Sequence, residues 1–193
     1  MTVLEALLNR KSTPPRLMDD QGPSPADVQD MMRAAMTAPD HGAIRPWRFV
    51  IIEGDDRAIL GQVFAEALRR RDPNATEEAI AKEVSRPLRA PTVIAILARV
   101  TLDRPNVPPV EQIVAAGCAA QNMLLAAEAK GFGAILLTGK NAQDGHVKAF
   151  FDMKDEDEII GFLYVGCAAG PVPNKARIAP EGYIEPFGKG AAA

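Results

Sequence analysis

The stretch TVIAILARV, residues 92–100, is almost continuously apolar. Runs of this kind are typical of a central strand that is covered on both faces of a sheet. Ala90-Pro91 ends the segment before it, and a proline-rich loop at residues 103–109 follows it. We therefore expect the remaining elements to be arranged around this strand, as further strands beside it and helices above and below.

Patterns on either side of this strand predict the other elements. Three more strands are expected, at residues 48–52, 134–138 and 158–167. Apolar residues at helical spacing predict helices at residues 2–9, 25–37, 59–71, 110–130 and 146–151, with one more beginning at Thr76. Strands and helices alternate only in part. The predicted class is therefore α+β, a single domain over residues 1–193 with a central mixed β-sheet of four to five strands covered by helices.

Two segments point to a partner subunit. The helix at residues 110–130 is apolar almost all round, which predicts burial on every side. The sequence leaves open whether the domain interior or a second copy of the chain covers it. The last segment, residues 168–193, is too rich in proline for a core element and too apolar for free disorder. An arm that packs on a partner subunit would explain both properties.

Composition argues against several classes of protein. The chain has 193 residues, of which 47% are hydrophobic and 24% are charged, as in an ordinary soluble globule. A net charge of -3 argues against nucleic-acid binding. Cys118 and Cys167 lie in apolar surroundings, and no Cys/His cluster has metal-ligand spacing. No apolar run approaches 18 residues and no signal-peptide pattern appears, so we expect no membrane span and a cytoplasmic location.

Common catalytic motifs are missing from the sequence. His146 is predicted to be a solvated surface group, whereas His41 follows a helix break, in a loop where functional residues are common. A Cys118–His41 pair would make a cysteine hydrolase, but Cys118 lies in the middle of a helix among alanines. A protein without a nucleophile or a proton relay fits chemistry that is performed by a cofactor. No residue is predicted to be catalytic, and none to bind a metal.

The N-terminal stretch LLNRKSTPPRL, residues 7–17, suggests where an anion could bind. Arg10-Lys11-Ser12 follows two apolar helical turns and precedes two prolines. A basic pair with a hydroxyl suits a phosphate. It also suits an ordinary helix C-terminus, where the helix dipole favours cations, and this is the preferred interpretation of the triplet taken alone.

Three stretches together resemble the nitroreductase family: LLNRKS at residues 7–12, TAPDHGAIRPWRFVII at residues 37–52 and AKGFGAILLTG at residues 129–139. Their order and spacing match, as do GCAAQNMLLAAEAKGFG and IIGFLYVG, so the resemblance covers nearly the whole chain. Within this family, the chain most resembles the small, compact branch. The resemblance implies an intertwined homodimer with FMN at two interface sites. It also implies an NAD(P)H oxidoreductase that passes hydride through FMN to nitroaromatic, quinone or similar small-molecule acceptors by a ping-pong mechanism.

The resemblance further implies which residues bind the cofactor. Arg10, Lys11 and Ser12 would hold the phosphate and ribityl chain, Thr37 and His41 would contact the flavin, and Leu136, Leu137 and Thr138 would run beside it. At positions 11, 37 and 137, relatives often carry arginine. Two cationic side chains are absent relative to such proteins, and Lys140, Lys175 or Arg177 could replace their charge.

Other functions remain open at this point. A flavin-binding or flavin-storage protein with little turnover would explain the reduced set of polar contacts. A relative that uses reduced flavin for dehalogenation or flavin destruction is a further alternative. Such branches usually carry a substrate lid, and the loop at residues 103–109 is short for that task.

Overall fold

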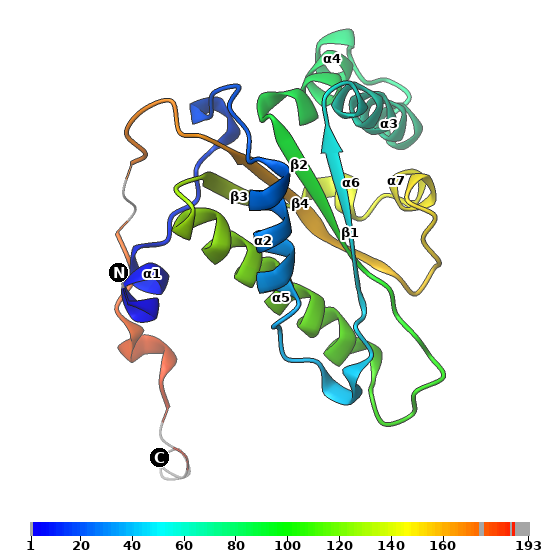
Figure 1. The fold of residues 1–193 in the computed structure, drawn as a ribbon. Coiled ribbons are helices and arrows are strands. Elements are labelled where there is room, and N and C mark those ends of the chain that lie inside the picture. The colour runs from blue at the N-terminus through cyan, green and yellow to red at the C-terminus, as the bar shows by residue number, and fades with distance from the viewer. Residues whose placement is uncertain (1, 174–175, 186, 188–193) are drawn as a thin grey trace, which may run out of the picture.

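A computed structural model describes residues 2–173, 176–185 and 187. Its sheet consists of β1 (Trp47–Glu53), β2 (Thr92–Ala98), β3 (Gly133–Leu137) and β4 (Glu158–Gly166). The spatial order is β1-β2-β4-β3, and each neighbouring pair is antiparallel (Figure 1). All seven residues of β2 are buried, which confirms the prediction that this strand is central.

Helices cover both faces of the sheet (Figure 1). One face carries α2 (Pro25–Ala35) and α5 (Pro109–Ala129). The other carries α3 (Asp56–Arg71), with α4 (Glu77–Ser85) packed on it, and the short helices α6 (Gly139–Ala142) and α7 (Gly145–Phe150). The predicted α+β class is therefore confirmed. Helix α6 was not predicted, because its four residues are too few to show a helical pattern.

We expected a mixed sheet. This prediction is wrong for the strands that the structure describes, because all three strand pairs are antiparallel. The connections explain this arrangement. Near the start of α3, Gly61 approaches Val84 near the end of α4, so the two helices form a hairpin. A helical hairpin returns the chain to the end of the sheet that β1 left, and β2 must then run antiparallel to β1.

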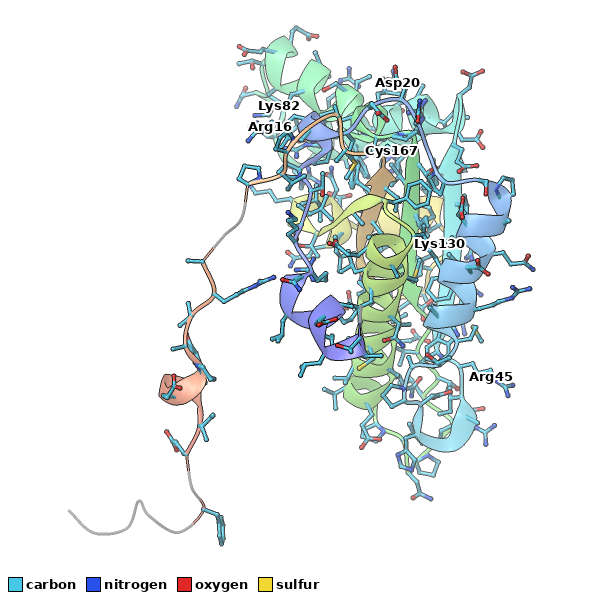
Figure 2. The ribbon with its side chains drawn as sticks, turned by 60° about the vertical axis from the view of Figure 1, so that its left-hand side comes forward. Arg16, Asp20, Arg45, Lys82, Lys130 and Cys167 are labelled. Atoms are coloured by element: carbon cyan, nitrogen blue, oxygen red, sulfur yellow. The ribbon has the colours of Figure 1, made fainter. Side chains whose placement is uncertain are left out.

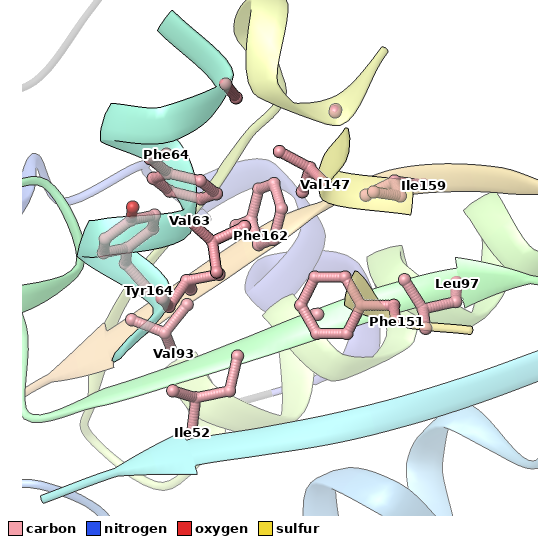
Figure 3. Close-up of a cluster of buried hydrophobic side chains, with 14 of the residues drawn as sticks. Ile52, Val63, Phe64, Val93, Leu97, Val147, Phe151, Ile159, Phe162 and Tyr164 are labelled. Carbon is pink, nitrogen blue, oxygen red and sulfur yellow. The ribbon is translucent and has the colours of Figure 1, made fainter. Parts of the chain in front are cut away.

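Strand side chains alternate between two cores, as the pleat requires. Ile94, Ile96 and Leu163 pack with α2 and α5. Val93, Leu97 and the β4 residues Phe162 and Tyr164 pack on the opposite face with α3 and α7, in the cluster drawn in Figure 3.

Local capping interactions set the helix boundaries as predicted. Ser24 accepts a hydrogen bond from the Asp27 N–H over 3.2 Å, and Pro25 takes the first position of α2. Thr76 accepts from the Ala79 N–H over 3.2 Å at the start of α4.

The prediction that His146 is a solvated surface group is wrong. Its side chain is only 19% exposed, because it packs beside Glu66 of α3 with a 2.9 Å separation between Nε2 and Oε2.

Apolar surface remains uncovered in the single chain. α1 (Val3–Asn9) packs along α5 and exposes four large apolar residues: Val3, Leu4, Leu7 and Leu8. α5 is buried along much of its length, yet Val110 and Val114 are exposed. The described tail residues 176–185 and 187 extend away from the sheet (Figures 1 and 2). Among the described helices, none is both long enough and apolar enough to cross a membrane.

Candidate functional site

The segment Arg10–Ser12 leaves α1 and is fixed to the edge of the sheet by the residue that follows it. The N–H of Thr13 donates to the carbonyl oxygen of Ala134 in β3 over 3.0 Å. Gly133 permits this contact, because a Cβ atom there would lie 2.8 Å from the Thr13 side chain. The triplet therefore lies beside the first residues of β3.

A pocket of about 290 Å³, named here the Arg10 pocket, opens at the triplet. It is lined by Leu8, Asn9, Arg10, Lys11, Ser12, Pro173 and Arg177. The Arg177 guanidinium donates to the carbonyl oxygen of Arg10, and the Arg10 guanidinium donates to Ser12 Oγ over 3.4 Å. Within the described residues, none of the three cations pairs with a carboxylate. Unpaired cations with a hydroxyl suit a phosphate group.

The C-terminal tail supplies one of the cations that the sequence analysis considered as replacements. Arg177 lines the Arg10 pocket. Lys140 lies elsewhere, at a pocket that it shares with Lys82 and Arg86. Lys175 falls outside the described residues. Of the two candidates that the structure describes, Arg177 is the one at the Arg10 pocket, although it lies 167 positions from Arg10 in the sequence.

Thr37 follows α2 and contacts α5. Its hydroxyl donates to the Ala34 carbonyl oxygen over 2.8 Å and accepts from Nδ2 of Asn122 over 3.2 Å. The Asn122 amide also donates to the Ala34 carbonyl over 3.2 Å. Sequence analysis missed Asn122, because a polar residue within a long apolar helix does not reveal its partner. The Thr37 side chain remains exposed beside α5.

His41 begins the turn η2 (His41–Ala43), in which Gly42 has φ of 72°. Its Nδ1 lies 2.7 Å from Oε2 of Glu111 in the first turn of α5. Both side chains are largely exposed, at 58% and 46%. Cys118, the nucleophile of the hydrolase alternative, packs instead against the core between α2, α5 and the sheet. No hydrogen bond joins Cys118 to His41 among the described residues.

The predicted segment at the end of β3 offers apolar surface and backbone. Leu136 packs toward the α5 face and Leu137 toward the α3 face. Thr138 is exposed, and Gly139 has φ of 64° at the start of α6. This conformation favours glycine. The segment contributes no cationic side chain, as its composition predicts.

Within one chain, the predicted residues thus form separate groups. Arg10, Lys11 and Ser12 share a pocket with the tail. Thr37 and His41 lie along α5 and contact Asn122 and Glu111. Leu137 and Thr138 line a third region, at the end of β3. Arg10 and His41 line different pockets, and no hydrogen bond between described residues connects the first two groups.

Comparison with known proteins identifies the family. The family model described as "Nitroreductase family" matches residues 7–167. The chain belongs to the nitroreductase family. Two relatives agree with this assignment and are named as NAD(P)H nitroreductases. Membership makes the protein an oxidoreductase.

The first relative is "Putative NAD(P)H nitroreductase YdjA" of Escherichia coli K12. It is 36% identical to this nitroreductase over 166 residues, covering 86% of this chain and 88% of that protein. The second, "Putative NAD(P)H nitroreductase" of Haemophilus influenzae, is 29% identical over 92% of this chain and 95% of that protein.

Solved structures show the same fold. The nitroreductase-like family protein of Bacillus cereus superposes with a TM-score of 0.81 at 21% identity, covering 97% of both chains. A nitroreductase of Bacteroides fragilis, solved with bound FMN, gives a TM-score of 0.71 at 18% identity, with 97% and 99% coverage. The nitroreductase-like fold predicted from the sequence is therefore confirmed.

Proposed function

We propose that this nitroreductase works as a homodimer that binds FMN, with the phosphate in the Arg10 pocket. The observation that carries the proposal is the convergence of Arg10, Lys11 and Arg177 without a carboxylate partner in the described residues. Neighbouring cations repel one another unless an anion lies between them. A phosphate carries about -1.5 to -2 charges at pH 7 and accepts several hydrogen bonds. The donor set of this pocket therefore fits the cofactor.

When bound, FMN would accept hydride from NAD(P)H and then deliver it to a nitroaromatic, quinone or similar acceptor in a ping-pong sequence. The residues of this chain bind the cofactor and orient it. Arg10, Lys11 and Ser12 hold the phosphate end, and residues 136–138, at the end of β3, give apolar and backbone contact to the flavin. Thr37 and His41 line the ring side of the site. Hydride transfer depends on close alignment more than on acids and bases, so no side chain is assigned as catalytic.

The separation of the two residue groups supports a site shared between two subunits. Uncovered apolar residues on α1 and α5 offer a surface that a second copy would bury. Residues 168–193 form the arm in this proposal, and the arm exposes Ile178, Tyr183, Ile184 and Phe187. An apolar groove of about 260 Å³ beside β1, with Ile51, Ile59 and Phe150 exposed, is a surface where the partner's arm could pack. Both described cysteines are free, as is usual in the cytoplasm, where we place the protein.

The visible spectrum of freshly purified protein tests the proposal. We expect a yellow dimer that bleaches when NADPH is added without oxygen and that oxidises NADPH steadily with a nitro or quinone acceptor. A colourless monomer that takes up no added FMN would refute it. A protein that binds FMN but shows no steady-state turnover would be the flavin-binding or storage alternative, for which the apolar pair at residues 136 and 137 is the supporting observation.

A further inference from the structure

A pocket of about 380 Å³ lies between the turn η2 and the loop that joins β2 to α5, residues 99–108, and we name it the His41 pocket. Both segments lie at the end of the sheet where β1 begins and β2 ends (Figure 1). The pocket shares no residue with the Arg10 pocket or with the region that Leu137 and Thr138 line. Its volume is within the range of small-molecule sites. The lining residues are His41, Gly42, Ile44, Asp103, Arg104, Pro105, Asn106 and Val107.

A buried glutamine holds the loop wall of this pocket in place. Gln112 of α5 is 1% exposed. Its Nε2 donates to the carbonyl oxygens of Thr101 over 2.8 Å and Val107 over 3.0 Å, and its Oε1 accepts from the Thr101 N–H over 2.9 Å. The N–H of Val107 also donates to the Arg104 carbonyl oxygen over 3.0 Å. Because both ends of residues 101–107 are tied to one helix, the pocket is formed before any ligand binds.

The charges of the lining residues cancel. Asp103 accepts a hydrogen bond from the Thr101 hydroxyl, which lowers the pKa of its carboxyl group, and the positive charge of Arg104 lowers that pKa further. Asp103 is therefore ionised at neutral pH, beside an arginine of opposite charge. His41 also has a partner, because its Nδ1 lies 2.7 Å from Oε2 of Glu111. A charged ligand would lose water in this pocket without meeting an ion that lacks a partner.

We propose that the His41 pocket selects uncharged aromatic rings as the electron acceptors of this nitroreductase. The proposal rests on the proposed function, which places His41 on the ring side of the FMN site. The apolar lining residues would pack on the ring of the acceptor. Asp103 and Arg104 would exclude ionised substituents, because each of the two already has an opposite charge beside it. The charge class of the acceptor is then set by this pair and not by the residues that contact the flavin.

Calorimetric titration of the oxidised holoprotein, without NAD(P)H, tests the proposal. Three probes share a nitrobenzene ring and differ in charge: 4-nitrobenzamide is neutral, 4-nitrobenzoate is an anion and 4-nitrobenzylamine is a cation. We expect the amide to bind about tenfold more tightly than either ion, because only the ions lose the hydration of a charge.

Two variants should change this preference in opposite directions. Asp103→Asn leaves the Arg104 charge unbalanced and should tighten the binding of 4-nitrobenzoate several-fold, the size of an exposed ion pair. Arg104→Met leaves the Asp103 charge unbalanced and should tighten 4-nitrobenzylamine by a similar factor. The control Arg33→Met should leave all three affinities unchanged, because Arg33 is 71% exposed on α2 and lies outside the pocket.

Turnover provides a second measurement of the same preference. Reduction of the nitro group to a nitroso group consumes the hydride of one NAD(P)H and one proton from solvent, and it releases water and NAD(P)⁺. In each protein, the order of kcat/KM among the three probes should follow the order of their affinities.

Two results would overturn the proposal in a protein that binds FMN and oxidises NADPH. One is binding of either ion as tightly as the amide by the unaltered protein. The other is an order of preference that folded Asp103→Asn and Arg104→Met variants leave unchanged, with folding verified by circular dichroism. Both results leave the proposed function standing. A protein that takes up no FMN refutes the proposed function instead, and the acceptor role of the His41 pocket falls with it.

Discussion

Two pockets of this chain are lined by cations but balance them differently. One is the Arg10 pocket; the other lies between the sheet, α3, α4 and α6, and we name it the Tyr164 pocket. Arg10, Lys11 and Arg177 have no carboxylate partner in the described residues, and they lie on segments outside the helices that cover the sheet. In the Tyr164 pocket, Arg71 and Arg86 are each tied to a carboxylate above a buried aromatic floor. The first pocket is suited to a strongly charged group. The second combines paired arginines with an apolar floor.

The two pockets also differ in the backbone contacts that support them. The Arg10 pocket depends on a strand edge, where Thr13 meets β3 at Gly133. The Tyr164 pocket depends on two packed helices, because a Cβ atom on Gly61 of α3 would lie 2.3 Å from the carbonyl oxygen of Val84 in α4. Backbone atoms at that distance cannot rotate away. We therefore expect the helical pocket to be the less tolerant of added volume.

Gly61→Ala should give the largest effect on stability. The added methyl group must push α3 away from α4, and overpacking of this kind costs about 3 kcal/mol of unfolding free energy. Urea denaturation measures the loss. Gly145→Ala is the matched control, because a Cβ atom added there would meet open space, and it should change the free energy by less than about 0.5 kcal/mol. Equal stability of the two variants would show that the α3–α4 contact is not fixed.

Arg10→Ala should weaken FMN binding by about 10- to 100-fold, the effect of losing a charge-assisted hydrogen bond to the phosphate. Fluorescence titration of apoprotein measures the affinity. Riboflavin lacks the phosphate, so its affinity should change much less. Arg33→Ala is the control, because Arg33 lies on α2 and pairs with Asp30 at 71% exposure. Equal losses for FMN and riboflavin would remove the phosphate from the Arg10 pocket.

His41→Ala should weaken FMN retention about three- to tenfold, the effect of losing one neutral hydrogen bond. The same titration measures it, and unchanged affinity would remove His41 from the site. Glu111→Gln keeps the shape of the residue that contacts His41 and removes its charge. Its FMN affinity tests whether the 2.7 Å contact positions the His41 imidazole ring.

A mixture of the two variants tests whether two chains share a site. If Arg10 of one subunit and His41 of the other meet at one FMN, an Arg10→Ala/His41→Ala heterodimer has one doubly altered site and one intact site. Half of the sites should then bind FMN with normal affinity. If both residues served one FMN from the same chain, no site in the heterodimer would be intact.

Much of this fold could be predicted from local patterns, because those patterns report local physics. The apolar run at residues 92–100 predicted the central strand, and Ser24 and Thr76 predicted helix starts by the bonds that they form. Strand direction was mispredicted, because it depends on the α3–α4 hairpin. His146 was mispredicted for a similar reason, since the surface of α3 that covers it is distant in the sequence.

The residues that group together in the candidate site could be predicted only where neighbours in the sequence are neighbours in space. Arg10–Ser12 is such a segment. Arg177 was one of three candidates, because nothing in the tail reveals which residue returns to α1. Of the residues that line the Tyr164 pocket, the sequence analysis named Leu137, Thr138 and Lys140 but not the rest. The lysines, the hydroxyl and the aromatic floor of this pocket come from α3, α4, α6 and β4, and each has an ordinary local pattern.

Lys130→Met should have the smallest effect on stability. It also tests whether FMN affinity depends on the unpaired cations of the Arg10 pocket or on overall charge. Lys130 contacts Asp27 at 3.0 Å and Asp30 at 2.6 Å. Hydrogen bonds from Ser24 and Lys130 lower the pKa of Asp27, and Lys130 lowers that of Asp30. Because these pKa values lie below the unfolded ones, the stabilisation is present at neutral pH and is lost as pH falls below about 4. Thermal unfolding should therefore show a small deficit at pH 7 that fades in acid. FMN affinity should stay unchanged, and a loss as large as that of Arg10→Ala would make overall charge, not the Arg10 pocket, the cause.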